Sequence, residues 1–378
     1  MTIAGLLVTG MGVALLGSLK LALAQRLGID ETRVGGMVSI FGFIIIPVIL
    51  TAGFFTDLVG RQAVLTAGFV LFAGSLVGLG CAGAYRNALL AVLLMGGAWA
   101  ASVNVLNVLT PVAFGGSLPY ATNLANFFFG LGAFLTPLAT AWLIRRGGFA
   151  TALLVLAGLA LVPAVLGLGV DFSALSSQSQ DEATLVGPTR ASSLWADPVM
   201  WLCGFGLFFY GPLEAAMGAW TTTYLKDKGI AERTAMVLLS GFWLAYMVSR
   251  LATAFSLPAG AEATLILAMS LACLGITAAI VWSRGRTTAV VLVLAAGLAF
   301  GPIFPTIMAI LLGHFDASVH GRAVGFLFAI GGIGWTTIPI LIGAYARRRG
   351  VQRGFLVAVA SCAGLCGVAL ALTGLGTS

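Results

Sequence analysis

The chain has 378 residues, of which 60% are hydrophobic and 8% are charged, and its formal net charge is +7. Soluble domains carry about 25% charged residues, so this composition excludes a soluble globular protein and predicts an integral membrane protein. The Lys and Arg residues are scattered among short loops and form no basic stripe, which argues against nucleic acid as a partner. The sequence shows no nucleophile with a base, no metal-ligand spacing and no phosphate-binding glycine loop, so we expect neither an enzyme nor a cofactor or metal.

Apolar stretches of 18 or more residues recur along the whole chain, separated by short charged or Gly/Pro-rich breaks. Each stretch is long enough to cross the hydrocarbon core as a helix. Lipid cannot hydrogen-bond to the backbone, so a segment that crosses it without pairing to other strands has to be helical. The alternating ten-residue pattern of a membrane β-barrel is absent from the sequence. We therefore predict an all-α membrane protein with twelve transmembrane helices, at about residues 3–25, 34–56, 63–84, 87–111, 120–144, 149–170, 198–224, 234–256, 263–283, 287–313, 322–345 and 354–375.

One connection, residues 171–197, is long and polar, and its composition is that of a linker. It divides the chain into an N-terminal bundle of six helices at residues 1–170 and a C-terminal bundle of six helices at residues 198–378. The two halves are similar in sequence. When the second half is shifted by 201 residues, positions 5–41 align without a gap and contain ten identities. Two parallel six-helix repeats are a plan that transporters use, so we expect two pseudo-symmetric bundles.

The connection between the second and third stretches reads Gly-Phe-Phe-Thr-Asp-Leu-Val-Gly-Arg at residues 53–61. Its glycines allow two helix ends to approach closely, and Asp57 and Arg61 are four residues apart, the spacing of a pair on one helix face. Such a pair either latches one conformation or forms an ordinary charged turn. The pattern resembles the loop 2–3 signature of the major facilitator superfamily at Gly53, Asp57, Gly60, Arg61 and Leu65, although Gln62 replaces the usual basic residue.

Three further stretches resemble the fucose:proton symporter branch of that superfamily. They are residues 123–133, where Asn126 replaces the branch's histidine, residues 210–225, with Tyr-Gly-Pro-Leu-Glu and Thr-Tyr-Leu, and residues 301–306. The resemblance implies a monomeric secondary active transporter with a cytoplasmic linker. Such a protein lies in a bilayer, normally the cytoplasmic (inner) membrane, and moves a small polar solute such as a sugar by alternating access. It also implies coupling to protons or Na⁺, although the branch's acidic site in the N-terminal half has no clear counterpart.

Charged residues inside membrane helices are functional candidates because burying them is costly. Glu214 lies about 22 Å along its helix from the loop residue Gly229, close to mid-membrane. It either carries the coupling ion, binds solute hydroxyls or serves as a structural acid. Arg250 either pairs with Glu214 or latches helix ends in the second half. Lys20 either extends to water or meets an anionic substrate.

The candidate substrate contacts are uncharged polar and aromatic residues. Asparagine amides donate and accept hydrogen bonds, which suits a hydroxyl-rich solute, but they also hold helices together in lipid. Indole rings stack on sugar rings, but they also anchor helices at the membrane interface. The candidates are Asn104 and Asn107, Asn123 and Asn126, each pair three residues apart on one helix face, and Trp220, Trp243 and Trp335.

Other interpretations stay open at this stage. An exporter of lipophilic compounds or a carrier of organic anions would use the same fold, and a membrane sensor without transport activity is a candidate from another class. The membrane orientation that the family resemblance implies also conflicts with the distribution of basic residues. Under the family topology, 14 basic loop residues lie outside and 3 lie inside, whereas the positive-inside rule favours the reverse orientation.

Overall fold

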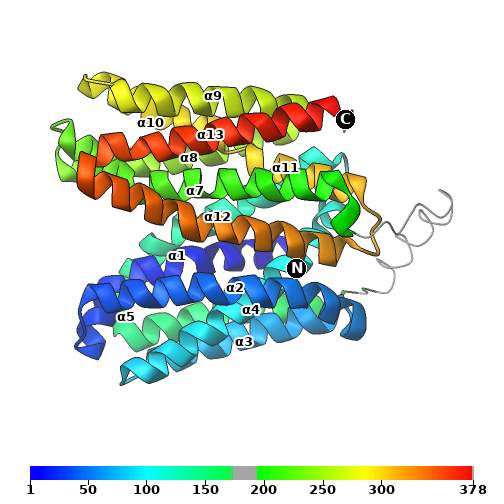
Figure 1. Cartoon of the computed structure of the whole chain (residues 1–378). Helices are drawn as coiled ribbons and strands as arrows, with labels where there is room; N and C mark the ends of the chain where they lie inside the picture. The colour runs from blue at the N-terminus through cyan, green and yellow to red at the C-terminus, as the bar shows by residue number, and fades with distance from the viewer. Residues whose placement is uncertain (171, 173–193, 377–378) are drawn as a thin grey trace. The chain divides into compact units, whose positions relative to one another are not determined.

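The computed structural model describes residues 1–170, 172 and 194–376, apart from the side chains of Glu31, Thr32 and Asp57 (Figure 1). Most of the predicted linker, 171–197, therefore lies outside the described residues. Regular structure in the described residues is helical: α1 Thr2–Leu27, α2 Glu31–Val59, α3 Arg61–Cys81, α4 Tyr85–Phe114, α5 Leu118–Leu168, the short 3₁₀ helix η1 Leu194–Ala196, α7 Pro198–Asp227, α8 Glu232–Ser256, α9 Glu262–Trp282, α10 Arg286–Phe300, α11 Ile303–His314, α12 His320–Arg349 and α13 Val351–Gly374.

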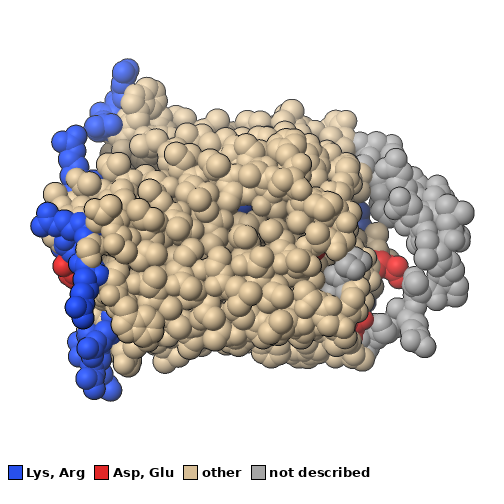
Figure 2. All heavy atoms as spheres, turned by 90° about the horizontal axis from the view of Figure 1, so that it is seen from above, with Lys and Arg blue, Asp and Glu red and all other residues tan. Residues whose placement is uncertain are grey.

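The described residues form eleven helical segments that are long and apolar enough to cross a membrane. Their hydropathy is high along the whole length because nearly all side chains are apolar, on the faces toward neighbouring helices and on the outer faces alike. Figure 2 shows the consequence: Lys and Arg side chains gather at helix ends, while the broad flank of the helices consists almost entirely of uncharged residues. The chain is a multi-pass membrane protein.

Two helices differ in detail from the predicted stretches. The predicted stretches 120–144 and 149–170 both fall within α5, which contains two helices joined at Gly148, a residue with non-helical angles of φ 79° and ψ 174°. The predicted stretch 287–313 is broken into α10 and α11 at Gly301 and Pro302. Proline lacks the backbone N–H that would continue the hydrogen-bond ladder of α10.

The described residues divide into two compact units. Unit 1 contains the described residues of Met1–Phe114, Phe128–Arg190 and Asp316–Phe326, and unit 2 contains those of Gly115–Phe127, Ala191–Phe315 and Leu327–Ser378. Each unit thus includes one short segment from the other half of the sequence. In unit 2, α9 packs against α13 and α10, and α7 packs against α8, α11 and α13.

Helix bounds repeat between the two halves well beyond residues 5–41. Adding 201 to the first and last residues of α3 gives Glu262 and Trp282, the bounds of α9. The same shift takes the first residue of α2 to that of α8 and the first residue of α4 to that of α10. The breaks between these helices therefore recur at the spacing found in the aligned residues.

Glycines allow close helix contacts in both units. A Cβ added at Gly132 of α5 would collide with the carbonyl oxygen of Leu7, and one added at Gly334 of α12 would collide with that of Phe208. The two glycines are 202 residues apart and their partners are 201 apart, close to the spacing of the repeat. Small residues let membrane helices approach backbone to backbone, so van der Waals packing replaces the hydrophobic effect as the source of cohesion.

Candidate functional site

Glu214 lies near the middle of α7, 16 residues from Pro198 and 13 from Asp227. At 1.5 Å per residue, it is about 24 Å from the first residue of the helix and about 20 Å from the last. Glu214 is half-buried. The carboxyl group interacts with the hydroxyls of Tyr210 and Tyr246 and with the positive charge of Arg250. An acid at this depth needs such partners because the surrounding side chains are apolar.

Two tyrosines connect Glu214 to Arg250. The hydroxyl oxygens of Tyr210 on α7 and Tyr246 on α8 are 2.6 Å apart. The Nη2 of Arg250 donates to the hydroxyl of Tyr246 at 2.5 Å, and the guanidinium carbon lies 4.2 Å from the centre of the Tyr246 ring. Both tyrosines are buried, so these polar groups have to satisfy one another. The result is a continuous polar network inside unit 2.

Arg250 is also bound to backbone carbonyls on two other segments. Its Nε donates to the carbonyl oxygen of Gly301, at the end of α10, at 2.8 Å. Its Nη1 donates to the carbonyl oxygen of Asn126, in the first part of α5, at 3.1 Å. The guanidinium group is buried, with 3% of the residue exposed. Arg250 thus joins α8, α10 and the Gly115–Phe127 segment while sharing its charge with Glu214. The sequence left a choice between a partner of Glu214 and a latch of helix ends, and both roles stay predictions.

Tryptophan rings flank the Glu214 face of α7. Gly211 and Gly218 lie three residues before and four residues after Glu214, on the same helix face. A Cβ added at Gly211 would lie 2.8 Å from the ring of Trp335, and one added at Gly218 would lie 3.3 Å from the ring of Trp243. The missing side chains therefore make room for one ring on each side of the acid. Trp243 also packs edge-on against Tyr246, with ring centroids 5.5 Å apart.

The remaining candidate tryptophan, Trp220, lies further along α7. Its ring is half-buried and lies next to Gly343 of α12, where an added Cβ would be 3.5 Å from the ring. In the first half of the sequence, Lys20 of α1 is half-buried and interacts with other residues of the protein.

The paired asparagines of α4 bind different partners. Asn104 is fully buried and donates from Nδ2 to the carbonyl oxygen of Gly321 at 3.0 Å. Asn107 donates to the carbonyl of Val103 in its own helix at 2.9 Å. Their shared helix face therefore does not give them a shared partner.

The asparagines of α5 lie in the segment of that helix that belongs to unit 2. Asn123 donates to the carbonyl of Pro119 at 3.0 Å and reaches the hydroxyl of Thr306 at 3.5 Å. Asn126 donates to the carbonyl of Thr122 at 2.9 Å, and its own carbonyl accepts from Arg250. Among the described residues, the buried Oδ1 atoms of Asn104 and Asn123 have no hydrogen-bond partner.

The residues of the loop 2–3 motif contact the Asp316–Phe326 segment of unit 1. A Cβ added at Gly53 would lie 2.6 Å from the carbonyl oxygen of Gly321, and Nη2 of Arg61 donates to the carbonyl of Ala317 at 3.4 Å. Gly60 forms the turn between α2 and α3 with φ 86°, a region that favours glycine. The Asp57 side chain lies outside the described part of the structure.

Sequence reasoning did not select Tyr210 and Tyr246 as site residues. Tyr210 lies four residues before Glu214 and Tyr246 lies four residues before Arg250, so each shares a helix face with the charged residue that follows it. This spacing was the available signal. Pairing the two faces requires the packing of α7 against α8, which spacing alone does not give.

A family model described as Major Facilitator Superfamily matches residues 2–339. The chain belongs to the major facilitator superfamily. Its members are transporters rather than enzymes, so the family prediction is confirmed. A curated relative, bypass of stop codon protein 6 of Saccharomyces cerevisiae, is 28% identical over 184 residues, which cover 45% of this chain and 37% of the yeast protein. The match spans little more than a third of that relative.

Solved transporters share the fold over nearly the whole chain. The human organic anion transporter MFSD10 is 16% identical with a TM-score of 0.78 and covers 97% of both chains. The E. coli fucose:proton symporter has 16% identity and a TM-score of 0.75, covering 98% of this chain and 97% of its own. A proton:xylose symporter solved with 6-bromo-6-deoxy-D-glucose has 13% identity and a TM-score of 0.82, covering 99% and 94%. At identities this low, the similarity to these structures shows the fold alone.

Proposed function

We propose that this protein is a proton-coupled secondary transporter of a small polar solute, most simply a sugar or a sugar-like compound, that works by alternating access. We also propose that it acts as a monomer in a cytoplasmic (inner) membrane. The observation that carries the proposal is the Glu214 network, in which the carboxyl group of a half-buried residue at mid-helix interacts with two tyrosine hydroxyls and an arginine and is flanked by two indole rings.

The proposal includes twelve membrane passes in two six-helix bundles, 1–170 and 198–378. The 51 residues of α5 would extend about 76 Å as one straight helix, far beyond a hydrocarbon core of about 30 Å. Gly148 interrupts α5 with φ 79° and ψ 174°, and Gly350, between α12 and α13, has φ 87° and ψ 155°. The two glycines are 202 residues apart, close to the spacing of the repeat. We therefore interpret α5 as two passes that turn at Gly148.

Glu214 is the proposed coupling site because a carboxyl group can exchange its proton as the cavity opens to each side. When Glu214 is charged, it attracts the guanidinium group of Arg250. When it is protonated, that attraction is lost, and Arg250 is held mainly by Tyr246 and by the carbonyls of Gly301 and Asn126. The charge of Glu214 would thus control how firmly Arg250 holds the first part of α5. This link is the proposed connection between proton binding and conformational change.

The substrate class follows from the groups around the acid. The rings of Trp335 and Trp243 lie beside α7 before and after Glu214, and a carboxylate accepts hydrogen bonds from hydroxyl groups. A ring that is apolar on its faces and rich in hydroxyls at its edge matches such a site. The Oδ1 acceptor of Asn123, which lies in the same unit as Glu214, is proposed as an additional contact. The similarity in fold to fucose and xylose symporters supports the same class.

Uptake by the purified full chain in proteoliposomes tests this function. Radiolabelled monosaccharides, organic anions and lipophilic cations are offered with an inward proton gradient, without a gradient and with a protonophore. The proposal predicts that at least one neutral sugar accumulates above its equilibrium level only with the gradient. Accumulation of no sugar under any gradient, with accumulation of another class, would contradict it.

A carrier of organic anions is the second candidate. Lys20 and Arg250 place positive charge within α1 and α8, and the fold is similar to that of a human organic anion transporter. Arg250 already donates to Gly301, Asn126 and Tyr246 and also interacts with the hydroxyl of Tyr210, so few of its five N–H groups are left for an anion. The uptake screen distinguishes the candidates directly, and it also reports the third possibility, export of lipophilic compounds.

A further inference from the structure

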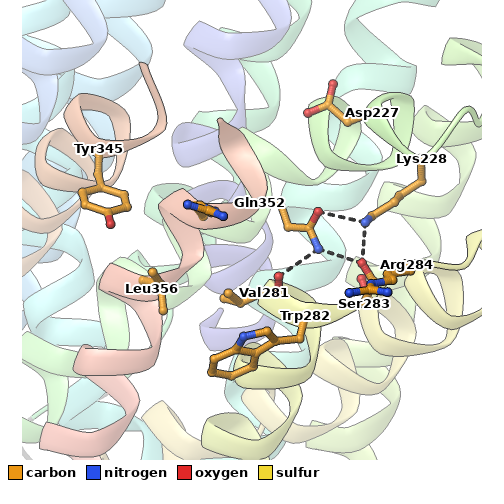
Figure 3. A pocket seen from close by; sticks show the side chains of 10 residues that line it. Asp227, Lys228, Val281, Trp282, Ser283, Arg284, Tyr345, Gln352 and Leu356 are labelled. Atoms are coloured by element: carbon orange, nitrogen blue, oxygen red, sulfur yellow. Dashed lines mark hydrogen bonds between the residues drawn. The ribbon is translucent and has the colours of Figure 1, made fainter. Parts of the chain in front are cut away.

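A polar cavity of about 650 Å³ lies at one end of unit 2, away from Glu214 (Figure 3). It lies where α7 and α9 end, near the last residues of α12 and the first of α13. Its lining includes Lys228, Arg284 and Arg353, with Asp227 as the acidic member, so the formal net charge of these four residues is +2. The aromatic residues Trp282 and Tyr345 and the apolar Leu356 also line the cavity.

Lys228 is held in place by the ends of two other helices. Its Nζ donates to the carbonyl oxygen of Ser283 at 2.5 Å and to Oε1 of Gln352 at 2.9 Å. Gln352 in turn donates from Nε2 to the carbonyls of Ser283 at 2.7 Å and Val281 at 2.9 Å, as Figure 3 shows. An ammonium group has three donors, so one N–H of Lys228 is left for a ligand. The cation is fixed before any ligand binds.

Arg284 and Arg353 differ from Lys228 in having no protein acceptor. Both are exposed, and within the described part of the chain no hydrogen bond or ion pair holds either guanidinium group. Two guanidinium groups with all their donors available suit the oxygens of a phosphate, which they bind in pairs. The Asp227 carboxylate opposes an anion, but the three cations outweigh it.

The position of the cavity along the helices identifies the source of the phosphate. The exposed fraction is 67% for Trp282 and 39% for Tyr345, and aromatic side chains at the ends of membrane helices mark the level of lipid headgroups. Arg347, Arg348 and Arg349 end α12 near the same level. Basic pockets between membrane helices on the cytoplasmic or matrix side bind anionic lipid headgroups, and the same pairing of guanidinium groups with phosphate applies at the headgroup level of either leaflet. We infer that this cavity binds the phosphodiester headgroup of an anionic phospholipid, with Arg284, Arg353 and Lys228 as its ligands.

Native mass spectrometry of the detergent-purified full chain tests this inference. The chain is titrated with phosphatidylglycerol and, separately, with phosphatidylcholine and phosphatidylethanolamine carrying the same acyl chains. The double variant Arg284→Gln/Arg353→Gln is compared with Arg347→Gln/Arg348→Gln, which removes the same charge from the neighbouring end of α12 without changing the cavity lining. Because all four side chains are exposed, we expect both variants to fold.

We expect phosphatidylglycerol to bind the wild-type chain more tightly than either zwitterionic lipid. The cavity variant should weaken this binding about thirtyfold, and the control by less than about threefold. Equal weakening in both variants would overturn the inference, because it would show attraction to general surface charge. Tighter binding of a zwitterionic lipid would also overturn it. A further titration with glycerol phosphate and inorganic phosphate tests a soluble phosphate as the ligand. If these compounds compete with phosphatidylglycerol at micromolar concentration, the cavity is a site for free phosphate rather than for lipid.

Discussion

Replacing Arg250 by lysine should destabilise the protein even though the charge is kept. Arg250 donates from three nitrogens, to Gly301 at 2.8 Å, to Asn126 at 3.1 Å and to the Tyr246 hydroxyl at 2.5 Å. The single nitrogen of lysine cannot reach all three acceptors, so we expect about two of these bonds to be lost. A hydrogen bond to a charged group contributes about 1.5–3 kcal/mol, and some of the loss is recovered by relaxation. The expected cost is about 3 kcal/mol of unfolding free energy.

Unfolding by SDS in mixed micelles, followed by tryptophan fluorescence, measures this cost. The matched control is Arg286→Lys, because Arg286 is exposed and donates from Nε to the carbonyl of Lys228 at 3.1 Å. The control should stay within about 0.5 kcal/mol of wild type. If Arg250→Lys also stays within that range, the buried network does not hold α8, α10 and the first part of α5 together, and the proposed link to α5 fails with it.

Three further predictions concern packing, the substrate site and sidedness. Gly334→Ala should lower the free energy of unfolding by about 1–3 kcal/mol in the same SDS assay, because its Cβ would collide with the Phe208 carbonyl. The control Gly367→Ala has open space around the new Cβ and should be neutral or slightly stabilising. Equal effects of the two variants would contradict the glycine-contact argument. Trp335→Ala should raise the KM for the transported sugar about tenfold or more, because the contact between the ring and the sugar is lost. Trp220→Ala, further along α7 from Glu214, should raise the KM about threefold or less. Equal effects or the reverse order would contradict the assignment of Trp335 to the substrate site. A reporter fused to the C-terminus should be active only in the cytoplasm, as the family topology requires, and activity only outside would show that the basic residues decide the orientation.

The positions of the helices could be predicted from hydropathy because a membrane helix needs a long apolar run, whatever its tertiary contacts. The break at Gly148 was predicted as a loop between stretches at residues 120–144 and 149–170, and the structure places a single non-helical residue there. The break at Gly301 and Pro302 was not predicted, because the surrounding residues are apolar on both sides and the run reads as continuous.

The candidate site was only partly accessible from sequence. Glu214 and Arg250 were found because charges are rare inside apolar stretches. Tyr246 was overlooked because a tyrosine in a membrane helix is an ordinary residue until a charged group is placed beside it. Asn104 and Asn107 share a helix face, yet one binds the carbonyl of Gly321 and the other its own helix. Spacing gives the face of a helix, and only packing gives the partner.

The central claim is that Glu214 couples solute movement to protons, and the most direct test is proton flux during transport. Proteoliposomes with a trapped pH dye receive the sugar identified in the uptake screen, with wild-type protein or Glu214→Gln. Glutamine keeps the size and hydrogen-bonding capacity of the acid but cannot release a proton. We predict internal acidification on sugar addition for wild type, and for Glu214→Gln sugar exchange without acidification. Equal acidification per sugar in the two proteins would contradict the account.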